Sequence, residues 1–226
     1  MNLVVNELFG PTFQGEGRSI GMPVMFLRLA GCNLHCSWCD TKYAWDWGQY
    51  DASTEMQSIL VQNVVERLLA SNCPRLVISG GEPMLQQKAL MELTSLLHAA
   101  GWWTEIETAG TMLPLSTDLV KQFNVSPKLE SSGNSYAARF HLEVLSTLND
   151  TRRAIFKFVV SQPKELDEVD AIVRPLSLSP VYIMPEGVTT EVILAKLGAL
   201  AEEVVKRGYY LAPRLHTLLY GGRRGV

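Results

Sequence analysis

Three of the four cysteines lie close together in the sequence, at Cys32, Cys36 and Cys39, in a C-x3-C-x2-C arrangement. In a reducing compartment, cysteines crowded in this way indicate metal or cluster ligation and not a disulfide framework. Three thiolates can bind three irons of a [4Fe-4S] cluster and leave the fourth iron free for a ligand that is not protein. A structural zinc site with His35 or Cys73 as fourth ligand is the alternative, although the second pair of ligands usual in such sites is missing.

A glycine-rich motif, Ser79-Gly80-Gly81-Glu82-Pro83, follows a short run of apolar residues. Glycines at the end of a strand let backbone groups approach a ligand without obstruction by side chains. The motif is therefore typical of a binding site at a strand end. A simple turn is the alternative interpretation.

Composition limits the class of protein. The chain has 226 residues, of which 47% are hydrophobic and 19% charged, and this balance excludes a disordered or collagen-like chain. The net charge of −3 argues against a large nucleic-acid footprint or a polybasic membrane anchor. The first residues lack the pattern of a signal peptide, and no stretch approaches the roughly 18 apolar residues that span a bilayer. We therefore expect a cytoplasmic protein that binds neither nucleic acid nor membrane.

Short β-branched runs alternate with stretches of helical periodicity along the chain. This alternation predicts an α/β fold with a parallel sheet, formed by residues 1–226 as a single domain. Six or seven strands in a chain of this length predict a partial (β/α) barrel with about six core parallel strands. Ligands of such folds bind at the carboxyl ends of the strands, which is where the cysteine loop and the glycine motif fall.

The pattern also places the individual elements. The predicted strands are 24–29, 76–79, 102–107, 122–125, 154–160, 181–184 and 209–212. The predicted helices are 54–69, with a capping box at Thr54 and Gln57, 85–100, 136–148, 164–173 and 190–207.

The cysteine spacing and the G-G-E-P sequence, in this order, resemble the two motifs of the radical S-adenosylmethionine (SAM) enzymes. In those enzymes SAM chelates the fourth iron, and the glycine motif binds the amino group of SAM. A third set of residues is similar to the 7-carboxy-7-deazaguanine synthase family of that superfamily. The resemblance runs from the Phe13 loop to His216 and is weakest over residues 133–188. The residues that carry it are Phe13-Gln14-Gly15-Glu16-Gly17, Arg28, Cys39-Asp40-Thr41, Glu107-Thr108-Ala109-Gly110-Thr111, Ser126-Pro127-Lys128 and His216.

This resemblance implies a radical SAM lyase of queuosine and 7-deazapurine biosynthesis. Its reaction contracts the ring of 6-carboxy-5,6,7,8-tetrahydropterin and releases ammonia. The implied cofactors are a [4Fe-4S] cluster, SAM and Mg²⁺, and the radical obtained when the reduced cluster cleaves SAM would take a hydrogen from C6 of the substrate. The implied partners are a one-electron reductant such as flavodoxin or ferredoxin and a second copy of the chain in a homodimer.

Transferred position by position, the resemblance implies a role for each matching residue. Cys32, Cys36 and Cys39 would bind the cluster, and Thr41 would bind Mg²⁺. The implied substrate contacts are Phe13, Gln14, Gly15, Arg28, Ser79 and His216. The implied SAM contacts are Trp38, Cys39, Asp40, Gly81, Glu107, Ser126, Pro127 and Lys128. These roles agree with the chemistry, because a substrate carboxylate suits a guanidinium group and a pterin edge offers donors and acceptors to an amide.

Two other functions stay open on the sequence. A glycyl-radical activating enzyme would share the cysteines and the glycine motif but would need a protein partner, and Gln14 and Arg28 argue against it. A zinc-stabilised binding module without catalysis is the alternative from another class. Cys73 is expected in the hydrophobic core. Four aromatic residues follow the cysteine loop, and a purely structural role is expected for them, with a cover over the cluster or a dimer surface as the alternatives. They are Tyr43, Trp45, Trp47 and Tyr50.

Overall fold

The computed structural model describes residues 1–226, and nine strands form one sheet with the order β3-β1-β2-β4-β5-β6-β7-β8-β9. The strands are β1 (Asn2–Phe13), β2 (Pro23–Leu29), β3 (Gln57–Leu60), β4 (Arg75–Gly80), β5 (Trp103–Thr108), β6 (Gln122–Val125), β7 (Ala154–Val160), β8 (Val181–Pro185) and β9 (Tyr210–Leu211). The seven strands from β2 through β4 to β9 run parallel, and β1 and β3 are antiparallel at one edge. The predicted partial barrel with a parallel sheet is therefore confirmed, with seven parallel strands where about six were expected.

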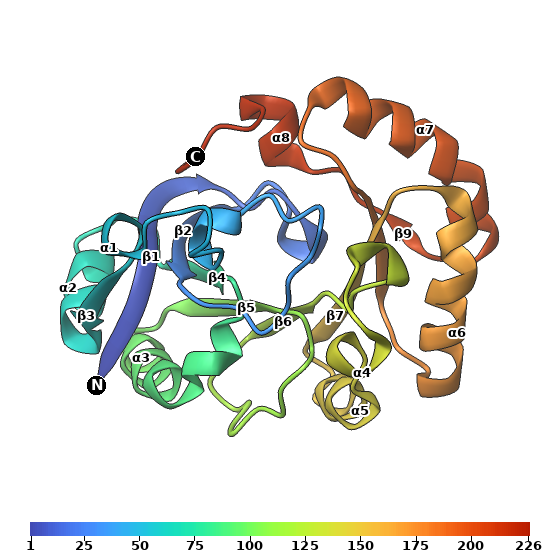
Figure 1. Cartoon of the computed structure of the whole chain (residues 1–226). Coiled ribbons are helices and arrows are strands. Elements are labelled where there is room, and N and C mark those ends of the chain that lie inside the picture. The colour runs from blue at the N-terminus through green and yellow to red at the C-terminus, as the bar shows by residue number, and fades with distance from the viewer.

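Helices cover the outer side of the sheet (Figure 1). They are α1 (Ala52–Glu55), α2 (Val61–Leu69), α3 (Gln87–Ala99), α4 (Tyr136–Arg139), α5 (Leu142–Asp150), α6 (Leu166–Leu176), α7 (Thr190–Lys206) and α8 (Leu215–Tyr220). The C-terminal segment after α8 returns to the region of β1, so that the two ends of the sequence take part in the same side of the fold (Figure 1).

Each longer helix packs on the sheet through one apolar stripe. In α2 the buried residues are Val61, Val64, Val65 and Leu68, which have the spacing of one helix face. A side chain of this kind stabilises the fold by about 1.5 to 3 kcal/mol when it leaves water. The stripes and the sheet together form a core cluster of 39 buried residues, which holds the strand ends in fixed positions.

The inner side of the sheet is polar. Glu105, Gln122 and Asn124 are buried there, and Ser19 from the loop after β1 donates to the Glu105 carboxylate. Gln122 and Asn124 donate to the same carboxylate at 3.3 and 3.1 Å. Because a buried carboxylate needs donors, this cluster holds the loop after β1 inside the barrel.

The N-terminal strand β1 and its partner β3 were not predicted. Register shifts between Val5 and Glu7 and between Phe9 and Thr12 interrupt the alternation that marks a strand in a sequence. Residues 57–60 were assigned to the start of a helix, but they pair with β1, and only the later part of the predicted helix 54–69 forms α2.

Two helix boundaries in the prediction were also wrong. The capping box at Thr54 and Gln57 does not form, because Asp51 caps the short α1 by accepting from the Ser53 amide at 2.8 Å. The predicted helix 136–148 is two helices, since the backbone at Phe140 and His141 is extended. The helix α8 had no predicted counterpart.

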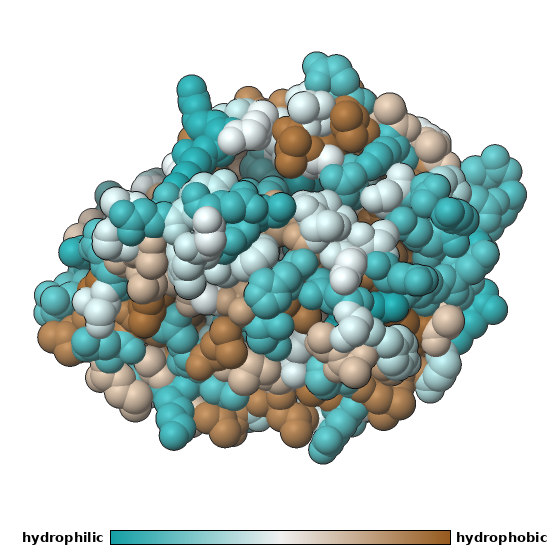
Figure 2. Space-filling model, viewed as in Figure 1, coloured by the Kyte–Doolittle hydropathy of each residue, from teal (hydrophilic) through white to brown (hydrophobic).

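None of the helices combines the length with the apolar character that crossing a membrane requires. On the face shown in Figure 2, hydrophobic side chains lie along the lower edge, over α3 and the region of α4 and α5, and a smaller group lies at the top, near α8 and α7.

Candidate active site

A cavity of about 230 Å³ opens at the carboxyl ends of the parallel strands. Its wall comes from the loops that follow seven of the strands, from side chains of the strands themselves and from Val226 at the C-terminal end. Of the predicted site residues, all line it except Gly15 and Pro127: they are Phe13, Gln14, Arg28, Cys32, Cys36, Trp38, Cys39, Asp40, Thr41, Ser79, Gly81, Glu107, Ser126, Lys128 and His216. The fold therefore brings together residues from positions 13 to 216 around one space.

The cysteine loop leaves β2 at Gly31, whose φ of +94° is a conformation that favours glycine. The Gly31 amide donates to the Ala44 carbonyl at 2.8 Å, which closes the loop at its base. Leu34 is buried under the loop and its amide donates to the Cys32 sulfur at 3.4 Å. The three thiols are thus held at one wall of the cavity by a loop with its own small apolar core.

The thiols suit a cluster better than a single ion. Burial raises the pKa of Cys32 to about 11 and also raises the pKa of Cys36, so both need a metal to become thiolates at neutral pH. No group of three His, Cys, Asp or Glu side chains is arranged to hold one metal ion. Three ligands of a [4Fe-4S] cluster contact three different irons and need not converge on one point.

The glycine motif lies directly against the cysteine loop. A side chain at Gly80 would come within 2.2 Å of the Leu29 carbonyl oxygen, and one at Gly81 within 2.1 Å of the Gly31 carbonyl oxygen. The Gly81 amide donates to the Leu29 carbonyl at 3.2 Å. Only glycines permit this close packing of the turn after β4 against the cysteine loop beside Cys32.

Glu82 of the same motif has a structural role. Its carboxylate is 1% exposed and accepts from the Ala109 amide at 2.7 Å and from the Thr108 hydroxyl at 2.8 Å. Burial raises its pKa, and these hydrogen bonds oppose the rise. Glu82 therefore ties the turn after β4 to the end of β5, and it is absent from the cavity wall.

Arg28 of β2 presents a free guanidinium edge to the cavity. Its Nε donates to the Glu7 carboxylate at 3.0 Å, while its two terminal nitrogens have no hydrogen-bond partner in the protein. Burial lowers its pKa, but Tyr43 and Glu7 outweigh this and raise it overall. The side chain is therefore a fixed cation with two donors available for a carboxylate.

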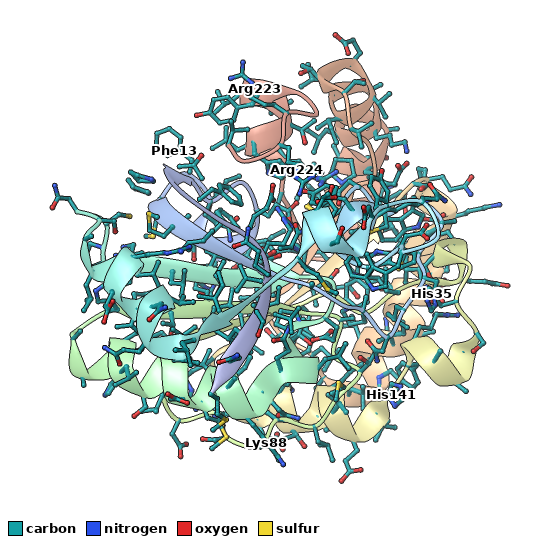
Figure 3. All side chains as sticks on the ribbon, turned by 60° about the vertical axis from the view of Figure 1, so that its left-hand side comes forward. Phe13, His35, Lys88, His141, Arg223 and Arg224 are labelled. Atoms are coloured by element: carbon teal, nitrogen blue, oxygen red, sulfur yellow. The ribbon has the colours of Figure 1, made fainter.

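Glu7 in turn binds Arg224 of the C-terminal segment, whose guanidinium also binds Glu55 and covers the Tyr43 ring at 3.8 Å. Figure 3 shows Arg224 between the C-terminal helix and the N-terminal strand. Arg28 is thus oriented by contacts from both ends of the sequence.

A second polar group lies beside Arg28, on the neighbouring strands β4 and β5, and centres on Glu107 of β5. Its carboxylate accepts from the Ser79 hydroxyl at 2.7 Å and from the Gln14 amide at 3.3 Å. Both partners belong to the predicted substrate contacts, whereas Glu107 was predicted to contact SAM. The three side chains form one surface of alternating donors and acceptors.

The sequence analysis did not single out Lys157 and Arg214, which pair with two acidic side chains in the cavity wall. Glu16, in the loop after β1, forms an ion pair with Lys157 of β7. It forms a second ion pair with Arg214, whose Nε lies 3.2 Å from the Glu16 carboxylate. Arg214 also pairs with Asp40 beside Cys39. Lys157, Glu16, Arg214 and Asp40 therefore link four segments of the cavity wall in one chain of ion pairs.

The ion pairs determine the charge of these groups. Burial raises the pKa of Glu16, but Lys157 and Arg214 outweigh burial and hold it well below its usual range. Burial lowers the pKa of Lys157, but Glu16 and Glu107 outweigh it and raise the value overall. The pKa of Asp40 is lowered, since Arg214 outweighs the effect of burial. All four groups are charged at neutral pH.

Lys128 lies at the third wall of the cavity. It donates to the backbone and side-chain oxygens of Ser126, both at 2.9 Å, and its ammonium lies 5.8 Å from the centre of the Trp38 ring. Pro127 between them is buried and does not reach the cavity. Lys128 thus brings one positive charge close to the cysteine loop.

His216 is placed by Gly15, because a side chain at Gly15 would come within 1.9 Å of its Nδ1. Its Nε2 lies 4.0 Å from Glu16, and burial lowers its pKa although Glu16 opposes this. His216 is therefore a neutral donor or acceptor at the cavity wall at neutral pH.

The Thr41 hydroxyl lies 3.6 Å from the Cys39 sulfur, at the same wall. Cys73 is buried in the main core and takes no part in the site, as expected. His35, one of the two alternative zinc ligands, is exposed on the outer side of the cysteine loop (Figure 3).

Residues 13–126 match the model of the 4Fe-4S single cluster domain family. The 7-carboxy-7-deazaguanine synthase of Pyrobaculum aerophilum is 36% identical over 227 residues, covering 98% of this chain and 96% of that protein. The enzyme of the same name from Rhodopirellula baltica is 33% identical, covering 100% of this chain and 89% of its own.

Two solved structures have a similar fold. The crystal structure of QueE from Escherichia coli has a TM-score of 0.74 and 25% sequence identity, and the match covers 95% of each chain. That of Streptococcus suis SuiB bound to its precursor peptide SuiA has a TM-score of 0.60 at 13% identity. This match covers 87% of this chain and 50% of SuiB. Because the identity is low, it indicates a shared fold alone.

Proposed function

The chain belongs to the 7-carboxy-7-deazaguanine synthase family of radical SAM enzymes. We infer from its site how it carries out the reaction of this family. It converts 6-carboxy-5,6,7,8-tetrahydropterin to 7-carboxy-7-deazaguanine with release of ammonia, a step of queuosine biosynthesis. The observation that supports this most is one cavity lined by the three cysteines, the glycine motif and a free Arg28 edge. A glycyl-radical activating enzyme and a zinc-stabilised binding module are set aside, because relatives of the synthase family match nearly the whole chain.

When bound, the [4Fe-4S] cluster and SAM supply the radical that takes a hydrogen atom from the substrate. We propose that Cys32, Cys36 and Cys39 hold the cluster. The proposed SAM contacts are the backbone at Gly81, together with Trp38, Asp40, Ser126 and Lys128. The ammonium of Lys128 lies between Ser126 and the Trp38 ring, where it can face the carboxylate of SAM. This position supports a contact with SAM.

The substrate requires two kinds of recognition. We propose that the free edge of Arg28 binds its carboxylate, and that Gln14, Ser79 and Glu107 bind the donors and acceptors of the pterin edge. Phe9 and Phe26 line the cavity beside Arg28, and their stacked rings have 5.2 Å between their centres. They would exclude water from the pterin ring of the substrate. His216 would complete this side of the pocket from the first turn of α8.

The remaining features of the family are proposals for this chain. We propose that residues 1–226 act as one radical SAM domain in the cytoplasm, that two copies form a homodimer, and that the electron comes from a one-electron donor such as flavodoxin or ferredoxin. Neither nucleic acid nor a membrane is a proposed partner.

The direct test of the function is turnover. Anaerobically reconstituted protein should convert carboxytetrahydropterin to a product of the mass of 7-carboxy-7-deazaguanine when SAM and dithionite are present. Omission of SAM should abolish the product. An absence of product from protein with full iron content and bound SAM would contradict the proposed substrate.

Arg28→Ala is expected to weaken substrate binding far more than SAM binding. A charge-assisted hydrogen bond contributes about 1.5 to 3 kcal/mol, so the affinity for substrate should fall on the order of 10- to 100-fold. Equilibrium binding of each ligand to protein with matched iron content measures this. Equal losses for both ligands would indicate general damage to the fold and not a lost carboxylate contact.

We propose Thr41 as a ligand of Mg²⁺, which would hold substrate oxygens in one orientation. Thr41→Val keeps the volume of the side chain and touches no thiol, so cluster and SAM binding should persist while turnover falls and loses its dependence on Mg²⁺. Thr41→Ser keeps the oxygen and should retain part of the rate. Product formation against magnesium concentration measures the effect, with thermal melting as control. A wild-type magnesium response in Thr41→Val would place the metal elsewhere.

A further inference from the structure

Each of the three cysteine sulfurs faces one N–H donor. The Leu34 amide donates to Cys32 at 3.4 Å, and this contact lies within the cysteine loop itself. The other two donors are side chains from outside the motif. Asn134 Nδ2 donates to the Cys36 sulfur at 3.3 Å, and Trp45 Nε1 donates to the Cys39 sulfur at 3.3 Å.

The amide of Asn134 can have only one orientation. Its Oδ1 accepts from the backbone amide of His35 at 2.9 Å. Because a backbone N–H can only donate, the side-chain oxygen of Asn134 must face His35. The nitrogen must then point to Cys36. A second contact of the nitrogen, to the Ser132 hydroxyl at 3.2 Å, fixes the side chain further.

The backbone around Asn134 is also docked on the cysteine loop. The Ser37 amide donates to the Ser132 carbonyl at 3.0 Å, and Ser132 is fully buried. Gly133 turns the chain in the left-handed conformation, with a φ of +79°. Asn134 is therefore held against the loop by the segment after β6, although it is 98 positions from Cys36 in the sequence.

Trp45 is held in a comparable way. Its ring packs edge-on against the His35 ring with 5.0 Å between the centres, and its single N–H points to Cys39. An indole N–H is only a donor and has no other acceptor in the protein. Trp45 lines the cavity wall, whereas the neighbouring Trp47 is exposed.

We propose that Asn134 and Trp45 are positioning residues that set the reduction potential of the cluster through hydrogen bonds to its cysteine ligands. The cluster takes up one electron from a low-potential donor, which adds negative charge that spreads over the sulfur ligands. An N–H directed at a thiolate stabilises this added charge and raises the potential. The inference rests on the cluster assignment of the proposed function and adds two residues to it.

Trp45→Phe tests one hydrogen bond with little loss of packing, because the ring remains and the N–H is removed. Trp47→Phe is the matched control. Asn134→Leu tests the second hydrogen bond, and Asn149→Leu is its control. Asn149 lies far from the cysteines in the sequence, and its side chain contacts the segment after α6. All variants are reconstituted anaerobically, and iron content and thermal melting are measured first.

The measurement is the reduction potential, obtained by equilibrating the protein with dithionite and redox mediators and recording the EPR signal of the reduced cluster. We expect the ratio of reduced to oxidised cluster at a fixed solution potential to fall roughly three- to tenfold in Trp45→Phe and in Asn134→Leu, where tenfold corresponds to 59 mV for one electron. The double variant should show both changes together. The controls should keep the wild-type potential.

The sign of the change separates this role from a structural one. A side chain that only shields the cluster would, when shortened, admit water and raise the potential, opposite to the loss of a hydrogen bond. An unchanged or raised potential in Trp45→Phe with full iron content would overturn the proposal. If Asn134→Leu loses iron, the reduction potential of Trp45→Phe alone decides whether the proposal stands. Failure of the proposed function would look different, because wild-type protein would then lack the cluster signal or the product.

Discussion

Replacement of Cys32, Cys36 or Cys39 by alanine is expected to abolish cluster binding completely. Each thiolate binds a different iron, so the loss of one leaves a second iron of the cluster without a protein ligand. Each variant should be colourless after anaerobic reconstitution, contain almost no iron or sulfide and form no product. Because the loop has its own small core around Leu34, the rest of the protein should remain folded. Circular dichroism and iron analysis on the same samples measure both effects.

Cys73→Ala is the matched control for these variants. Cys73 is buried in the main core and has no contact with the cysteine loop, so its replacement should cost about 1 kcal/mol of stability and leave the iron content unchanged. Wild-type iron content in any of the three loop variants would contradict the cluster assignment. Loss of iron in Cys73→Ala alone would indicate a fourth protein ligand.

Lys157→Met should have the second largest effect, on stability as well as activity. Lys157 is 5% exposed, and its removal leaves Glu16 and Glu107 in the cavity wall with less compensating charge. Removal of one partner from a buried ion pair costs about 3 to 5 kcal/mol. Chemical denaturation of the variant measures this loss, and Lys164→Met, at an exposed position on the following loop, should change stability little.

The pH dependence of this effect follows from the pKa shifts. Glu16 has a native pKa below its unfolded value of about 4.3, so it contributes stability above that pH, and the contribution is lost as pH falls toward the native pKa. Lys157 has a raised native pKa, so its contribution is present below about pH 10.4 and is lost as pH rises through the native pKa. The stability difference between wild type and Lys157→Met should therefore be largest between about pH 5 and pH 10 and should narrow toward pH 3.

A double variant distinguishes charge from packing. Lys157→Met combined with Glu16→Gln removes the uncompensated carboxylate, and part of the lost stability should return at pH 7. Equal loss in the single and double variants across the whole pH range would show that the lysine stem contributes by packing alone.

The sequence was sufficient for the parts of the site that are local. The C-x3-C-x2-C loop and the G-G-E-P turn are short motifs, and their residue types are required by chemistry and by the close approach at Gly80 and Gly81. The alternation of strands and helices likewise predicted the parallel sheet, because each repeated unit buries its apolar stripe on its neighbours.

The ion pairs in the cavity wall could not be predicted because their partners are distant in the chain. Lys157 is 141 positions from Glu16, and Arg214 is 174 positions from Asp40. Nothing in the local sequence distinguishes Lys157 from an exposed strand residue, except that it lies in the otherwise apolar run of β7. A lysine inside a buried run is a signal that could have indicated a buried partner.

The N-terminal strand was missed for a different reason. Strand prediction depends on regular alternation, and the irregular register of β1 moves side chains off that pattern. The same strand carries Glu7, which orients Arg28, and leads directly into the loop that carries Gln14.

The late position of Asn134 has a consequence for the synthesis of the protein. A ribosome adds about 5 to 20 residues per second, so the 98 positions from Cys36 to Asn134 take roughly 5 to 20 s to produce. The three thiols therefore emerge from the ribosome earlier, by this interval, than the segment that covers them. Exposed thiols are open to oxidation, and their higher oxidised forms are irreversible. A nascent chain damaged at this stage could still complete its sheet, since the core does not depend on the loop, and would yield a folded protein unable to bind iron.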